Sequence, residues 1–107
     1  MRIHINVSSK YIKQNLSVAL TISEIVENVF VSKSTLTKHF QKELSMSVNE
    51  YIYSLIMSEA ANMLLTSSVT IQSVSEKFGF SDQLYFSKRF KEKFGKSPRE
   101  YRKSASL

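Results

Sequence analysis

The sequence GFSDQLYFSKRFKEKFGKSPREYRK, residues 79–103, combines positive charge with regularly spaced aromatic residues. Residues 88–103 contain eight Lys or Arg and two Glu, whereas the rest of the chain contains seven basic and seven acidic side chains. The net charge of +6 therefore comes entirely from this segment. Its basic side chains are expected to face a polyanion such as nucleic acid, or an anionic membrane.

The aromatic residues of this stretch have the period of a helix. Phe86, Phe90 and Phe94 are spaced by four residues, which predicts one buried stripe on an amphipathic helix. We therefore expect these rings in a hydrophobic core and not stacked on bases. If they are buried, the outward side chains of the same helix are Gln83, Leu84, Ser87, Lys88 and Lys91.

The same pattern occurs twice in the chain. The first occurrence is Phe40-x3-Leu44-x2-Ser47-x2-Glu50-Tyr51, and every one of these residue positions has an identical or aromatic counterpart exactly fifty positions later, ending at Glu100-Tyr101. Further upstream the shift is 49, so one extra residue separates the two copies, between Ser81 and Phe86. An ordered set of matches at one spacing indicates a repeated supersecondary unit.

Each unit is predicted to be two short helices joined by a tight turn. Thr21 with Glu24 forms a capping box, and Ser32 is expected to cap the second helix. In the second unit Thr70 and Ser81 are the corresponding caps, and Gly79 supplies a turn residue that tolerates positive φ. This is the helix-turn-helix arrangement, whose second helix can enter a major groove. Burial of Leu36 and Phe40 leaves these side chains outward in the first unit: Lys33, Ser34, Thr35, Thr37, Lys38 and Gln41.

A long helix is predicted between the units. Residues from Ser47 to about Thr66 contain no Gly or Pro, and Ser47 with Glu50 forms another capping box. We expect three segments: 1–46, an N-terminal helix and the first helix-turn-helix; 47–66, the connecting helix; 67–107, the second helix-turn-helix and a closing helix. About 20 helical residues span about 30 Å, close to the roughly 34 Å between successive turns of DNA. Ile56 in this helix, if exposed, is a candidate contact for a partner domain.

Composition excludes several other classes. With 107 residues, the chain has room for one compact domain or two small ones that share a helix. Cys is absent, which excludes disulfides and thiolate metal sites. No apolar run or signal peptide indicates a membrane or secreted protein, so a cytoplasmic location is expected. No nucleophile motif, phosphate loop or metal-ligand spacing is present, so neither an enzyme nor a cofactor is expected.

The second unit resembles the signature of AraC/XylS-type bacterial transcriptional regulators. The resemblance rests on Ile71-x2-Val74-x4-Gly79-Phe80-Ser81-Asp82-Gln83-x2-Phe86-Ser87-x2-Phe90-Lys91-x2-Phe94-Gly95-x-Ser97-Pro98-x2-Tyr101-Arg102. The first unit matches more loosely, at the corresponding positions. The resemblance implies an all-α domain of seven helices, in which two helix-turn-helix subdomains are joined by a long connecting helix. The function it implies is sequence-specific binding of double-stranded DNA, with two recognition helices in adjacent major grooves.

Site residues follow from the motif positions. The resemblance implies phosphate contacts from helix N-termini and neighbouring lysines, and partners that include RNA polymerase and an effector or receiver domain in the parent chain. An alternative is a helical protein-interaction module whose basic surface meets an acidic partner. The base-reading residues implied are Ser34, Thr35, Thr37, Lys38, Gln83, Leu84, Ser87 and Lys88, and the phosphate contacts are Ser32, Lys33, Lys42, Ser81 and Lys91.

Overall fold

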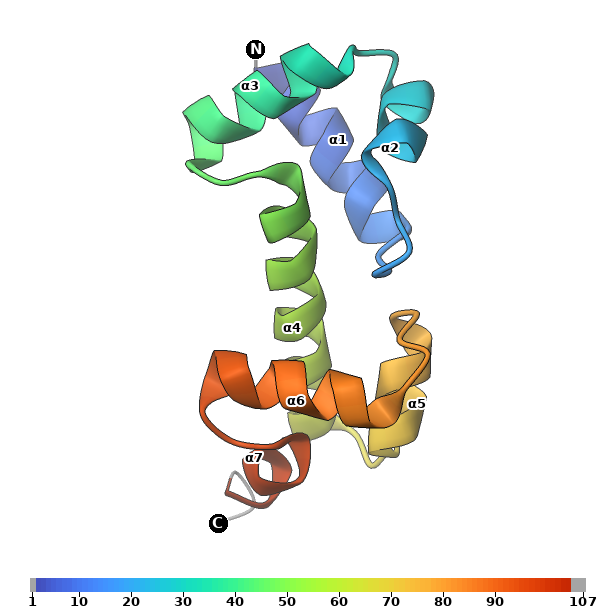
Figure 1. Ribbon diagram of the computed structural model, residues 1–107, viewed down its shortest axis with the longest axis vertical. Coiled ribbons are helices and arrows are strands. Elements are labelled where there is room, and N and C mark those ends of the chain that lie inside the picture. Colours follow the sequence, from blue (N-terminus) through green and yellow to red (C-terminus); the bar gives the residue numbers. More distant parts are fainter. Residues whose placement is uncertain (1, 105–107) are drawn as a thin grey trace. The chain divides into compact units, whose positions relative to one another are not determined.

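The computed structural model describes residues 2–104, with side chains from residue 6 onward. Within this part of the chain the structure consists of helices joined by turns, without strands, as predicted (Figure 1). The seven helices are α1 (Arg2–Gln14), α2 (Ile22–Val29), α3 (Lys33–Leu44), α4 (Val48–Thr66), α5 (Ile71–Lys77), α6 (Gln83–Phe94) and α7 (Pro98–Ser104).

The chain divides into two compact units, Met1–Leu55 and Ile56–Leu107. The division falls within α4, so each unit contains part of that helix. The predicted partition into segments 1–46, 47–66 and 67–107 stays a prediction. Each unit has its own hydrophobic core, as expected for a small helix-turn-helix domain.

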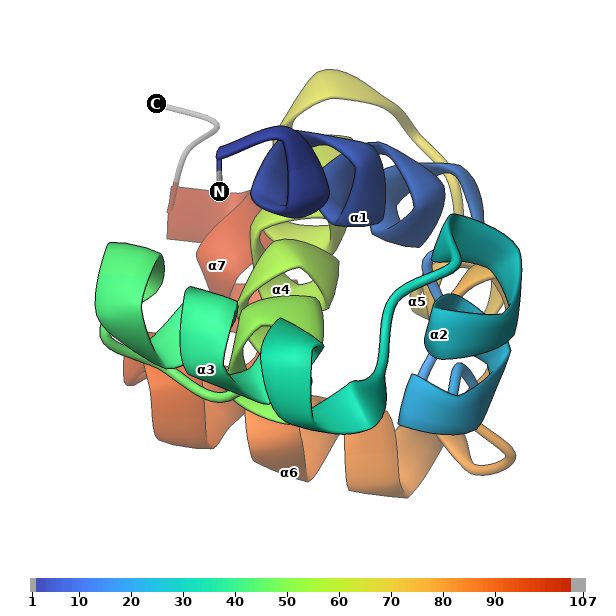
Figure 2. The same cartoon turned by 90° about the horizontal axis from the view of Figure 1, so that it is seen from above.

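In the first unit, α1 packs against α2 and α3, and α2 packs against α3 (Figure 2). Ile12, Ile25, Leu36 and Phe40 are completely buried, which confirms the predicted inward positions of α3. The ring of Tyr51, on α4, meets Phe40 edge-on with centroids 5.3 Å apart. These contacts fix α3 by its apolar stripe and leave its opposite surface to solvent.

In the second unit, α6 packs against α5 and α7. Phe86 and Phe90 are completely buried, as predicted, whereas Phe94 is only half-buried. Phe90 lies 4.6 Å from Phe94 and 5.3 Å from Tyr101 between ring centroids, and Phe86 lies 5.1 Å from Phe80. Aromatic pairs at these separations stabilise more than their buried area alone. The rings of α6 therefore pack that helix against its neighbours, as predicted for core residues.

Capping interactions define most of the helix starts. The side-chain oxygens of Thr21, Ser32 and Thr70 accept hydrogen bonds from backbone N–H groups three residues later, as predicted. The boxes at the starts of α4 and α7 are reciprocal. The Ser47 N–H donates to Glu50 Oε1 at 2.8 Å, and the Glu50 N–H donates to Ser47 Oγ at 3.0 Å.

These capping boxes lower the pKa values of both glutamates. Hydrogen bonds from the backbone N–H and the side chain of Ser47 lower the pKa of Glu50 below its ordinary value of 4.5. Ser97 lowers the pKa of Glu100 in the same way, with help from the positive charges of Lys91 and Lys96.

The predicted cap of α6 is wrong. The N-cap is Asp82, whose Oδ1 accepts from the Leu84 N–H at 2.9 Å, and Ser81 lies one residue earlier. The extra residue of the second unit is thus in the turn, and the Asp82 carboxylate takes the position that Ser32 has in the first unit. An ionised carboxylate accepts from a helix N-terminus more strongly than a hydroxyl does, because it also interacts with the helix dipole.

The C-terminal end of α4 is held by a side chain from α7. Arg102 donates from Nε to the Leu64 carbonyl at 3.0 Å and from one terminal nitrogen to the Val69 carbonyl at 2.6 Å. The same nitrogen lies 3.4 Å from the Ser67 carbonyl. The Leu64 carbonyl is in the last turn of α4, where carbonyls have no partner within the helix, so a cation that binds it there is stabilising; the carbonyls of Ser67 and Val69 are in the connection to α5. Ile56 is 1% exposed, so the conditional suggestion that it contacts a partner domain is wrong.

Candidate nucleic-acid interface

The second helices of the two units, α3 and α6, have the same length and the same register. Each has 12 residues, and each position of α3 corresponds to the position fifty residues later in α6. Leu36 and Phe86 are equivalent, as are Phe40 and Phe90, and all four are completely buried. The surface of each helix opposite this stripe is the candidate interface.

The outer surface of α3 is polar and partly cationic. Ser34, Thr37 and Lys38 are exposed, as predicted for outward positions of this helix, whereas Thr35 is half-buried; their contacts with bases stay a prediction. The Thr35 hydroxyl accepts a hydrogen bond of 2.8 Å from Ser32 Oγ, so part of its hydrogen-bonding capacity serves the cap. Three of the predicted phosphate contacts of this unit are also exposed: Ser32, Lys33 and Lys42.

The outer surface of α6 begins with an amide and an apolar side chain and is cationic further along. Gln83 and Leu84 in the first turn are exposed, and Leu84 exposes 78% of its surface. Lys88 and Lys91 follow, both exposed, while Ser87 is half-buried. The predicted site residues of α6 are thus exposed on one helix, except Ser87, which is less exposed than its motif position suggested.

The N-termini of the two helices differ in charge. A neutral Ser32 caps α3, and Lys33 follows it, an arrangement suited to a phosphate. The carboxylate of Asp82 caps α6 and no cation lies in its first turn, so this end is less favourable to a phosphate than the N-terminus of α3. Ser81 is exposed, and its phosphate contact stays a prediction, although the helix N-terminus that motivated it belongs to Asp82.

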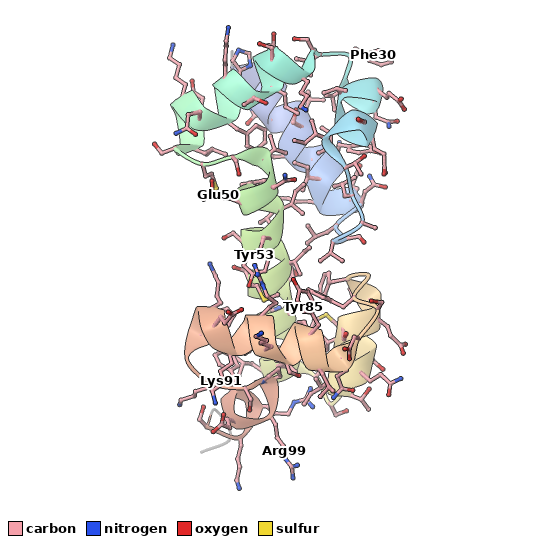
Figure 3. The ribbon with its side chains drawn as sticks, viewed as in Figure 1. Phe30, Glu50, Tyr53, Tyr85, Lys91 and Arg99 are labelled. Atoms are coloured by element: carbon pink, nitrogen blue, oxygen red, sulfur yellow. The ribbon has the colours of Figure 1, made fainter. Side chains whose placement is uncertain are left out.

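Tyr85 is a candidate interface residue that the motif positions did not include. It is 53% exposed and its ring centroid lies 6.2 Å from that of Phe80. Figure 3 shows Tyr85 and Lys91 leaving α6 on different sides. Tyr85 lies five residues before Phe90, whereas the residues of the buried stripe are spaced by four. This difference in spacing is the sequence signal that could have identified Tyr85.

Not every basic side chain of residues 88–103 is available to a polyanion. Arg102 binds carbonyls in the last turn of α4 and in the connection that follows it, so the expectation that all of these cations face a partner is wrong for this residue. Arg89 lies 3.8 Å from Glu92 in an ion pair whose members are 39% and 57% exposed. Such surface pairs contribute little to stability.

Comparisons with known proteins identify the family and the fold. The sequence matches the helix-turn-helix domain family over residues 25–104. It is 36% identical over 100 residues to the Msm operon regulatory protein of Streptococcus mutans, an alignment that covers 94% of this chain and 36% of that protein. The structure superposes on the C-terminal domain of AraT, a response regulator from Geobacillus stearothermophilus, with a TM-score of 0.88 and 28% identity, covering 97% and 87% of the two chains.

A third comparison concerns a domain solved with DNA. The DNA-binding domain of AdpA in complex with a target DNA has the same fold, with a TM-score of 0.80 over 91% of this chain and 87% of that one, at 18% identity. The chain belongs to the AraC/XylS-type helix-turn-helix family of transcription regulators, and it is a DNA-binding domain of that family. Regulators of this family are not enzymes.

The chain spans about a third of the length of the curated relatives it matches, which include the lactose operon transcription activator of Staphylococcus xylosus. Among residues 2–104, none of the helices is both long and apolar enough to cross a membrane.

Proposed function

We propose that this chain is the operator-binding part of a longer bacterial transcription regulator, and that α3 and α6 are its recognition helices. The observation that supports this most directly is the register of the two helices. Both bury the same apolar stripe and both expose a lysine at the equivalent outward position, Lys38 and Lys88. A lysine at such a position can donate to guanine acceptors in a major groove.

Base recognition in this proposal divides between the two helices. Side chains of α3 contribute hydroxyl groups that can serve either edge of a base pair, and α6 contributes an amide, an apolar group and a lysine. Phosphate contacts come mainly from exposed lysines, because they neutralise charge without reading sequence. The proposed base-reading residues are Ser34, Thr35, Thr37, Lys38, Gln83, Leu84, Ser87 and Lys88, with Ser32, Lys33, Lys42, Ser81 and Lys91 on phosphates.

We also propose that the two helices occupy adjacent major grooves of one asymmetric operator. In support, α4 is a single helix of 19 residues and contains neither Gly nor Pro. The parent regulator would add an effector or receiver domain and contact RNA polymerase, and the domain would act in the cytoplasm. These partners are proposed from the family and from the greater length of the curated relatives.

Selection of bound DNA from a random pool tests the function. We expect a conserved site of about two helical turns and an affinity that falls steeply with salt, because phosphate binding releases counterions. A conserved site confined to one turn would contradict the paired arrangement. Binding to all polyanions alike, or to an acidic protein with no preference among DNA sequences, would contradict operator recognition.

A further inference from the structure

An apolar side chain stands at the start of the outer surface of α6. Leu84 is 78% exposed, and among the large hydrophobic side chains that the structure describes only Phe30 is more exposed. An isolated exposed Leu is common on protein surfaces. This one lies one turn before Lys88, on the side of α6 opposite to Phe86 and Phe90, and therefore on the surface proposed to enter a groove.

The equivalent position of α3 has different chemistry. Ser34 corresponds to Leu84 by the shift of fifty, and it too is exposed. The two helices therefore offer a hydroxyl and an isobutyl group at the same place. A hydroxyl can donate to or accept from several base edges, whereas the isobutyl group can only make apolar contacts. In the major groove of unmodified DNA the apolar group is the C5-methyl of thymine.

The electrostatics of the first turn of α6 favour bases over the backbone. The Asp82 carboxylate is fixed by its hydrogen bond from the Leu84 N–H, and the lysines of this helix, Lys88, Lys91 and Lys93, come later. A phosphate is less favoured beside Asp82 than at the N-terminus of α3, while the residues at the start of a recognition helix are those that reach base edges. A contact between Leu84 and a base therefore replaces no strongly favourable contact between this helix end and a phosphate.

We propose that Leu84 contacts the C5-methyl group of a thymine in the groove entered by α6. This rests on the proposed operator binding, and it specifies one base of the operator half bound by α6. The operator half bound by α3 faces Ser34, which is equivalent to Leu84. This half therefore carries no such requirement for a methyl group. The two half-sites therefore have different requirements at this position, which gives the operator a direction.

Deoxyuridine provides a direct test, because it pairs as thymidine does and lacks only the methyl group. After an operator has been selected with the wild-type chain, each thymidine is replaced singly by deoxyuridine and Kd is measured by fluorescence anisotropy. We expect one position in the α6 half to weaken binding by about fourfold, the effect of one buried methyl group. Leu84→Ala should abolish this sensitivity, and the matched control Ser34→Ala should retain it.

A second measurement adds the methyl group in place of removing it. At the sensitive position, cytosine·guanine should bind more weakly than 5-methylcytosine·guanine with the wild-type chain, and equally with Leu84→Ala. Because Leu84 is exposed, the substitution should leave the circular dichroism spectrum and the unfolding midpoint unchanged.

The outcomes separate this inference from the proposed function. A selected operator with no deoxyuridine-sensitive thymine in the α6 half, or a sensitivity that persists in Leu84→Ala, overturns the thymine contact and leaves operator binding in place. Wild-type affinity and specificity in Leu84→Ala also overturn it, because the side chain would then make no contact with a base. If no conserved site is selected at all, the proposed function fails, and this inference fails with it.

Discussion

Phe30 and Gly79 occupy equivalent turn positions of the two units, and both have a left-handed backbone, with φ of 55° and 84°. The same relationship holds at the ends of α3 and α6, where Ser45 and Gly95 have φ of 55° and 77°. Both glycines of the chain are therefore in the second unit, at positions that require positive φ. Residues with a Cβ are strained in this conformation. We infer that this strain makes the first unit less stable than it would be with glycine at the same two positions, as in the second unit.

Phe30→Gly should stabilise the first unit. The substitution relieves a strain of about 1 kcal/mol, and it removes little buried surface, because Phe30 is 92% exposed on the turn between α2 and α3 (Figure 3). The free energy of unfolding, measured by urea denaturation, should rise by about that amount. Ser45→Gly should have a similar effect, and Gly79→Ala the opposite one. A loss of stability in Phe30→Gly would show that the ring makes stabilising contacts.

Replacement of Arg102 should destabilise the second unit without a direct effect on DNA contacts. Arg102→Met removes a charged donor from the carbonyls of Leu64 and Val69, which should cost about 1.5–3 kcal/mol. Thermal unfolding measures the loss. Arg102→Lys should recover only part of it, because an ammonium group cannot reproduce the two-nitrogen geometry of a guanidinium.

Arg99 is the matched control for this prediction. It is on the same helix and is exposed, and it projects away from α7 in Figure 3. Arg99→Met should change the free energy of unfolding by less than about 0.5 kcal/mol. Equal losses in the two variants would contradict a specific role for the Arg102 hydrogen bonds.

Lys88 and Lys91 should differ in how their loss affects DNA binding. Lys91→Met should weaken binding to all sequences and reduce the slope of log K against log salt by about 1, as expected for one lost phosphate contact. Lys88→Met should instead relax the preference at one base pair, with a discrimination loss of about 1–3 kcal/mol. Anisotropy titrations of the selected operator and its single-base variants, at several salt concentrations, distinguish the two patterns. Interchanged patterns would mean that the two roles have been assigned the wrong way round.

The contribution of Glu50 to stability should depend on pH. Since hydrogen bonds from Ser47 lower its pKa in the folded state, the ionised carboxylate stabilises the fold at pH values above 4.5, the ordinary value. This contribution is lost as the pH falls below 4.5 and through the lowered pKa of the folded state. Glu50→Gln should therefore be less stable than the wild type at pH 6, and the difference should shrink under acid conditions.

Urea midpoints of both proteins between pH 6 and pH 3 measure this effect. Glu59→Gln, which neutralises an exposed carboxylate further along α4, is the control for a general loss of negative charge. A wild-type advantage that stays constant down to pH 3 would contradict a role for the ionised carboxylate.

Most of the fold could be predicted because it depends on local patterns. The spacing of Phe86 and Phe90 predicted the buried stripe, and the caps at Thr21, Ser32 and Thr70 predicted helix starts that the structure confirms. These signals act within one or two helical turns, where the backbone geometry fixes which residues are neighbours. The repeat extended them to the pairing of helices, because two copies of one unit bury equivalent surfaces.

Other features required the tertiary structure. Ser81 and Asp82 are both good caps, and only the path of the turn decided that Asp82 occupies the position. The sequence counted Arg102 among the cations of residues 88–103, but its hydrogen bonds are to carbonyls more than thirty residues earlier in the chain.

By itself, then, the sequence determined the helices, their apolar stripes and the family, because each of these depends on residue type and on spacing along the chain. Tertiary structure decided how much of each side chain is left for a partner. In the folded chain Arg102 binds backbone carbonyls and is no longer part of the charged surface. Thr35 and Ser87 are half-buried, and Leu84 is exposed. The physical reason is that exposure and hydrogen-bond partners depend on segments distant in sequence, whereas helical periodicity does not.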